Sequence, residues 1–155
     1  METRLFEGNL RKMQTELASP IQYTLNLGEN QIDMTALVGT HFKMKFTGVI
    51  NCVNCGRVTK KSFGQGFCYP CFMNAPQAAP CILRPELCEA HLGKGRDVEW
   101  EERNHNQPHV VYLAIASGIK VGITRETQVP YRWIDQGASR AVKIAITENR
   151  YQAGM

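Results

Sequence analysis

The chain has 155 residues, of which 43% are hydrophobic and 21% charged, with a net charge of +4 and a pI of about 8.8. These values are typical of one globular domain or two small ones, and they exclude wholesale disorder. No apolar run approaches the roughly 18–20 residues that a membrane span needs, and the first residues lack the apolar core of a signal peptide. We therefore expect a cytoplasmic protein with no membrane partner. Six cysteines in such a chain favour thiols held by metal over disulfides.

The first fifty residues predict a short helix followed by a β meander. Apolar residues at three-to-four-residue spacing favour an amphipathic helix over residues 1–18. Alternation of apolar and polar residues predicts strands over 21–27, 32–38 and 41–50, with a turn after the first of them. The side chains expected to face inward from the third strand are Phe42, Met44 and Phe46.

Two C-x-x-C pairs follow the third predicted strand, and twelve residues separate them. A C-x-x-C hairpin tip can direct two thiolates at one ion, and two such knuckles complete a tetrahedron around Zn²⁺. One alternative is four buried free cysteines. A redox pair is another, although its usual βαβ context is missing. The predicted zinc ligands are Cys52, Cys55, Cys68 and Cys71.

The next segment, residues 73–108, is rich in proline and should lack long regular elements. It holds Cys81, Cys88 and His91, and the last two have knuckle spacing. A second zinc site there needs a fourth ligand, for which His105 is the first candidate and His109 the second. The alternative is that the two cysteines pack as small buried hydrophobic residues.

Beyond residue 108 the pattern predicts a hairpin, a short helix and another strand. The hairpin strands cover 109–116 and 119–124, and Gly122 marks a bulge or a close approach. A third strand covers 141–147, and a final helix begins after it. The signals for the intervening helix are a cap at Thr127, a first-turn Pro130 and a stop at Gly137.

The segments V-V-Y-L-A, K-V-G-I-T-R and Y-R-W-I-D-Q-G-A, within residues 109–155, resemble the opening of a GIY-YIG nuclease domain. That family begins with a hairpin carrying its two tripeptide motifs, followed by a helix with a catalytic arginine. With C-Y-P-C-F and R-P-E-L-C added, nearly the whole chain is similar to an uncharacterised bacterial family that joins a Cys-rich zinc-binding half to a GIY-YIG-like module. The resemblance implies a truncated module, because the nuclease family's metal-binding Glu lies on a later helix.

The resemblance also assigns roles to individual residues. Tyr112 matches the Tyr of the first motif, Gly122 the Gly of the second and Arg132 the helix arginine. Two positions depart from the pattern: Lys120 replaces the second motif's Tyr, and Gln136 stands where many members have His. In such a site Tyr112 would position or activate the nucleophile, and Arg132 would contact phosphate oxygens. The implied catalytic set, working with Mg²⁺ or Mn²⁺, is Tyr112, Lys120, Gly122 and Arg132.

Basic and aromatic residues surround the four cysteines and could contact nucleic acid through phosphates and bases. The mildly basic charge of the chain agrees with a polyanionic partner. The alternative is a solvated lysine face and aromatic rings that pack beside the metal. The residues concerned are Lys43, Lys45, Arg57, Lys60, Lys61, Phe63, Phe67, Tyr69 and Phe72.

We expect an α+β fold in three parts. They are a helix and a small antiparallel β meander over residues 1–50, a Cys-rich zinc-binding module over 51–107, and a GIY-YIG-like hairpin, helix and strand over 108–155. The expected function is nucleic-acid binding by a zinc protein, with metal-dependent phosphodiester hydrolysis if the module is active. The alternatives are a non-catalytic zinc-stabilised adaptor that binds protein or RNA, and a thiol oxidoreductase.

Overall fold

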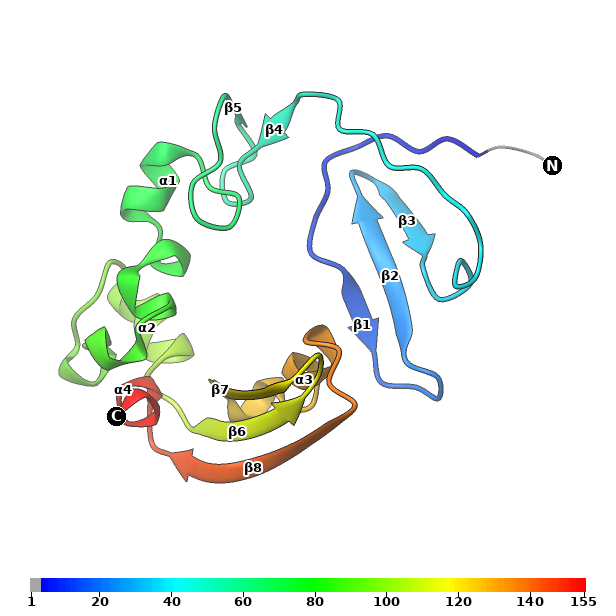
Figure 1. The fold of residues 1–155 in the computed structure, drawn as a ribbon. Coiled ribbons are helices and arrows are strands. Elements are labelled where there is room, and N and C mark those ends of the chain that lie inside the picture. The colour runs from blue at the N-terminus through cyan, green and yellow to red at the C-terminus, as the bar shows by residue number, and fades with distance from the viewer. Residues whose placement is uncertain (1–3) are drawn as a thin grey trace.

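A computed structural model describes residues 4–155 as a mixed α and β chain with antiparallel sheets (Figure 1). The elements follow one another around an open arc, from an N-terminal sheet through a Cys-rich segment and a group of short helices to a C-terminal sheet. Contacts with Asp135 join the two ends of the arc: Thr15 donates to its carboxylate at 3.1 Å, and Lys12 forms an ion pair with it. The longest α-helix of residues 4–155 has seven residues, too few to cross a membrane.

The N-terminal sheet contains β1 (Gln14–Glu16), β2 (Gln22–Leu27) and β3 (Asn30–Asp33), in that order and all antiparallel. The strand predicted over 21–27 is confirmed as β2. The second predicted strand is shorter and begins earlier, because the turn after Leu27 returns the chain at once and Asn30 pairs with Leu27. Every residue of β2 is only half-buried, so this sheet has no deep core of its own.

The prediction of a helix over residues 1–18 is wrong for the described residues. Residues 4–13 have no helix, and the segment continues into β1. Its backbone pairs with the hairpin beside it: Arg11 N donates to Asn26 O at 3.0 Å, and Gly28 N donates to Asn9 O at 2.9 Å. A Cβ on Gly8 would lie 2.6 Å from Gly28 N, so this close approach needs glycine. The hairpin therefore satisfies backbone groups that a helix would have satisfied internally.

The strand predicted over 41–50 is also wrong except at its end. Residues 41–49 have no regular structure, and Phe42, Met44 and Phe46 are 55%, 66% and 72% exposed instead of facing inward. An alternating sequence forms a strand when a neighbouring strand pairs with it, and residues 4–155 supply none here. The chain becomes regular again at β4 (Ile50–Asn51), which pairs with β5 (Val58–Thr59).

The Cys-rich segment continues as short helices, in agreement with the predicted absence of long elements. It begins with α1 (Tyr69–Asn74) and ends with α2 (Val98–Asn104). Between them lie four 3₁₀ turns, three of which begin with proline, whose fixed φ suits the first turn of a helix. The turns are η1 (Pro76–Ala78), η2 (Pro80–Ile82), η3 (Pro85–Leu87) and η4 (Ala90–Leu92).

The C-terminal sheet confirms the predicted hairpin, helix and strand. Its antiparallel strands lie in the order β7-β6-β8, so the first of them in the chain is central (Figure 1). Thr127 does not cap the predicted helix, because a 3₁₀ turn, η5 (Glu126–Gln128), holds it and Pro130 takes the cap position. The elements are β6 (His109–Ile115), β7 (Ile119–Arg125), α3 (Tyr131–Asp135), β8 (Arg140–Thr147) and α4 (Arg150–Gly154).

One face of β6 forms the core of this sheet. Val110, Tyr112 and Ala114 are at most 2% exposed and pack against the α3 region, where Trp133 contacts the Tyr112 ring edge to face. Tyr112 pairs with Gly122 across the hairpin. A Cβ on Gly122 would lie 2.6 Å from the Tyr112 hydroxyl, so the glycine leaves room for the phenol. This is the close approach that the sequence pattern predicted.

Gly122→Ala should therefore destabilise the C-terminal sheet, because the new methyl group must displace a buried ring. We expect a loss of about 1–3 kcal/mol in the free energy of unfolding, measured by urea denaturation. Gly118→Ala is the matched control, because a Cβ there meets no atom within 4 Å. Equal stability of the two variants would contradict the packing described for Tyr112.

Candidate metal centre

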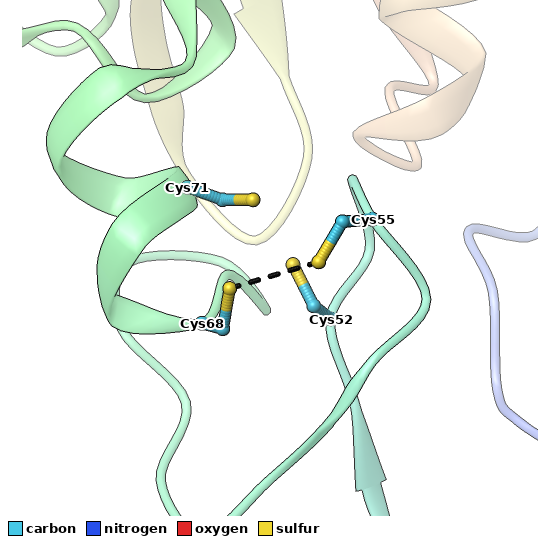
Figure 2. Close-up of side chains that lie close together, drawn as sticks. All are labelled: Cys52, Cys55, Cys68 and Cys71. Carbon is cyan, nitrogen blue, oxygen red and sulfur yellow. Dashed lines mark hydrogen bonds between the residues drawn. The ribbon is translucent and has the colours of Figure 1, made fainter.

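The first cysteine pair lies in the turn between β4 and β5. Cys52 directly follows β4, its N–H donates to Arg57 O at 2.9 Å, and its carbonyl accepts from Gly56 N at 2.9 Å. Gly56 has a φ of +74°, a conformation in which glycine avoids the strain of a Cβ. The tight turn brings the Cys52 and Cys55 side chains to the same side of the hairpin (Figure 2).

The second pair starts a helix rather than forming the tip of a hairpin. Cys68 is the N-cap residue of α1, Cys71 lies in its first turn, and Phe72 N donates to Cys68 O at 2.9 Å. Pro70 occupies the start of the helix, where its missing N–H removes no helical hydrogen bond. A hydrogen bond of 2.9 Å from Val53 N to Gly66 O joins the turn of the first cysteine pair to the loop that precedes the second pair.

The four sulfur atoms converge on one point between the hairpin and α1 (Figure 2). All of them lie within 4.8 Å of one another, and Cys55 Sγ is 3.7 Å from Cys68 Sγ. A disulfide would need a separation of about 2.05 Å, and all four cysteines are free thiols. A tetrahedral zinc ion with Zn–S bonds of about 2.3 Å separates its sulfur ligands by about 3.8 Å. The spacing therefore fits a metal ion such as zinc.

The surroundings of the sulfur atoms favour the thiolate form at Cys52 but not at Cys71. Burial would raise the pKa of Cys52, but the backbone N–H groups of Cys55, Cys68 and Asn54 lower it to about 6. The Asn54 side-chain amide donates to Cys71 Sγ at 3.3 Å and would lower the pKa of that thiol. Partial burial and the three neighbouring sulfurs outweigh this effect and raise it to about 11. Four negative sulfurs can share this space only beside a cation.

A second group of ligand-type side chains lies farther along the chain. Cys81, Cys88, Glu101 and His105 are all buried, with one ligand atom from each within 4.8 Å of the others. Burial, together with the charges of Glu101 and Cys88, raises the pKa of Cys81 to about 11. Burial beside Arg150 lowers the pKa of His105 to about 4, which keeps its imidazole neutral.

Of the three histidines predicted as ligands of a second site, one lies in the second group and two lie outside it. His105 lies in the second group, whereas His91 does not: it is exposed, and its ring stacks on Tyr151 at 4.7 Å between centroids. His109 also lies outside the group and donates from Nδ1 to Gln107 O at 2.7 Å. His91 follows Cys88 at knuckle spacing but lies in the 3₁₀ turn η4, outside this group.

Glu101 was missed in the sequence analysis. Acidic residues surround it in the sequence, so it resembles part of a solvated surface. One signal could have identified it. Glu101 lies four residues before His105, which places both on one side of α2.

The residues assigned by likeness to a nuclease do not form an open site around Tyr112. Its hydroxyl donates to Gln136 Oε1 at 2.9 Å, and the residue is 1% exposed. Gly122 lies opposite it in the hairpin, while Lys120 and Arg132 are exposed. A group that activates a nucleophile must come within hydrogen-bonding reach of the substrate, and a buried, bonded phenol does not.

Aromatic residues near the four cysteines mostly pack on one another. Phe63 stacks with Phe72 at 5.9 Å between centroids and meets the edge of Tyr69 at 5.3 Å. Phe67 is buried, whereas Tyr69 is 56% exposed. Phe63, Phe67 and Phe72 thus form a small core beside the cysteines, and Tyr69 leaves part of its ring accessible.

Comparison with known proteins gives one match. The family model described as "Protein of unknown function (DUF2797)" matches residues 39–155, which include both groups of ligand-type residues. No curated protein and no solved structure matches the chain. The description names no nuclease, so the likeness to GIY-YIG enzymes stays a prediction.

Cys55→Ser should reduce the zinc content of the purified protein by one ion per chain. Cys55 is the exposed member of the four, so its replacement removes a ligand without opening a cavity in the core. Zinc content is measured by inductively coupled plasma mass spectrometry. Val58→Ala, an exposed change in the same hairpin, should keep all its zinc.

Zinc should also be released as the pH falls. Protons compete with the metal for thiolates, so affinity is highest where the ligands bind zinc as anions and is lost on acidification. Titration with a zinc-sensitive dye should show release on going from neutral to acidic pH. Zinc content that stays constant across this range would contradict thiolate ligation.

Proposed function

We propose that this chain, which belongs to the DUF2797 family of proteins of unknown function, is a zinc-binding protein whose Cys-rich segment binds nucleic acid without hydrolysing it. The observation that carries the proposal is the distribution of charge around the four-cysteine centre. Nucleic-acid binding draws most of its affinity from contacts between cationic side chains and phosphates.

The positive excess of the chain falls in one segment. Residues 34–85 contain six Lys and Arg residues and no acidic residue. Residues 1–33 have five acidic residues against three basic ones, and residues 86–155 have nine of each. Zinc held by four thiolates carries a formal charge of −2, so the segment keeps a positive charge after metal binding. Its basic residues are Lys43, Lys45, Arg57, Lys60, Lys61 and Arg84.

The basic side chains closest to the centre in sequence are available to a partner. Arg57, Lys60 and Lys61 belong to the stretch between the two cysteine pairs, and all three are exposed. None of them takes part in an ion pair with the acidic residues of the described chain. Lys61 Nζ lies 5.3 Å from the centre of the Phe63 ring, a distance at which a cation interacts with the ring face.

Exposed aromatic rings in the same segment favour a partner with accessible bases. Phe42 and Phe46 are 55% and 72% exposed and flank Lys43 and Lys45 in a stretch without regular structure. Bases stack on aromatic side chains while the backbone phosphates follow neighbouring cations, a combination typical of single-strand binding. Tyr69, at the start of α1, adds a third accessible ring.

The burial of Tyr112 supports binding without hydrolysis. Its hydroxyl is bonded to Gln136 and lies beneath the α3 region, so it could act on a phosphodiester only after a rearrangement of the core. The exposed Lys120 and Arg132 remain able to contact phosphate as cations.

Binding is tested by fluorescence anisotropy with a labelled single-stranded oligonucleotide at several salt concentrations. Replacing Arg57, Lys60 and Lys61 by Glu should weaken binding and reduce the slope of log K against log salt by about 2, since each phosphate contact on a single strand contributes about 0.7. The matched control replaces the exposed Lys94, Arg140 and Lys143, which lie outside the basic segment. Equal losses in the two triple variants, or no binding by the wild type, would reject the proposal.

Hydrolysis is tested separately with DNA and RNA substrates in the presence of Mg²⁺ or Mn²⁺. We expect intact substrate with the wild-type chain, because Tyr112 is closed off. Cleavage that disappears in Arg132→Ala would contradict the non-catalytic part of the proposal and leave the binding part unchanged.

A further inference from the structure

We infer that Cys81, Cys88, Glu101 and His105 form a second zinc site, closed to solvent and structural in role. It is separate from the four-cysteine centre and does not depend on the proposed nucleic-acid binding. Its ligands come from three consecutive pieces of the chain: η2, the residue after η3, and α2 with its C-terminal end.

One ligand separation is close to that in a tetrahedral zinc site. Cys81 Sγ lies 3.9 Å from His105 Nδ1, close to the roughly 3.6 Å that a zinc ion with bonds of about 2.3 Å to sulfur and 2.0–2.1 Å to nitrogen would impose. A Glu101 carboxylate oxygen contacts the same imidazole nitrogen.

Gly95 leaves room for the Glu101 side chain. A Cβ on Gly95 would lie 2.3 Å from Glu101 Cγ, so a larger residue at position 95 would displace the carboxylate. A buried carboxylate for which a glycine leaves room is consistent with a metal ligand at this position.

The charges balance when a dication is present. Two thiolates and a carboxylate carry three negative charges, so Zn²⁺ leaves the site at −1. The half-buried Arg150 guanidinium lies beside it and donates to the carbonyls of Cys81 at 3.0 Å and Ile82 at 2.7 Å. One zinc ion and Arg150 together neutralise the site, which removes the cost of burying an uncompensated charge.

The ligand set points to a structural rather than a catalytic ion. Sulfur, nitrogen and carboxylate oxygen are ligands that zinc accepts, and a catalytic zinc keeps a position open for water. Here the protein fills all four positions, and no ligand residue is more than 7% exposed. The ion would fix α4 to the Cys-rich segment, because Arg150 N also donates to His105 O at 2.9 Å.

The first measurement needs no variant. Elemental analysis of the folded wild-type chain should give two zinc ions per chain. One zinc per chain, with Cys81 and Cys88 open to alkylation while the other four cysteines stay protected, would overturn the inference.

Paired variants then identify the ligands. His105→Ala and Glu101→Gln should each lose one zinc ion, whereas His91→Ala and Glu102→Gln, which change exposed neighbours, should keep both. Equal zinc loss in His91→Ala and His105→Ala would reject the assigned ligand set. If the ligand variants fail to fold, Cys55→Ser keeps the second site intact. Its cobalt form should show weaker thiolate-to-metal absorption than a four-sulfur centre, and a four-sulfur spectrum would reject the site.

Discussion

The structure depends on four sulfur atoms that two separate pieces of chain bring to one point. The buried residues of the segment from the β4–β5 turn to the start of α1 are Cys52, Phe67 and Cys68. A core of this size cannot offset the conformational entropy of ordering the loop between the pairs. A bound ion would add folding free energy that the small core does not supply. With an ion bound, the centre would hold in place the exposed basic loop on which the proposed function rests.

The two ligand groups are linked through α1. This helix begins with Cys68 and Cys71 and ends against Arg96, whose guanidinium donates to the carbonyls of Phe72 and Ala75 at 2.9 Å each. Arg96 directly follows Gly95, whose missing Cβ leaves room for the Glu101 side chain of the second group. α1 and Arg96 thus lie between the two groups, and the hydrogen bond from Arg150 N to His105 O joins the second group to α4.

The sequence was most informative where local signals and long-range packing agree. The hairpin and third strand of the C-terminal half have apolar runs, a short turn and a Gly122 that leaves room for Tyr112, so these elements were predicted correctly. The pairing of Cys52 with Cys55 and of Cys68 with Cys71 followed from spacing alone. The alternating pattern over 41–49 did not form a strand. A strand needs a neighbouring strand to pair with, and the local sequence does not show whether one is present. Glu101 was not identified from the sequence, because the burial of its carboxylate depends on segments that lie elsewhere in the chain.

Zinc K-edge X-ray absorption on the purified chain shows whether sulfur atoms hold the metal. We expect a first shell dominated by sulfur at about 2.3 Å, with a smaller nitrogen and oxygen contribution near 2.0–2.2 Å. A shell of nitrogen and oxygen without sulfur, or a protein that folds with no bound metal, would contradict it.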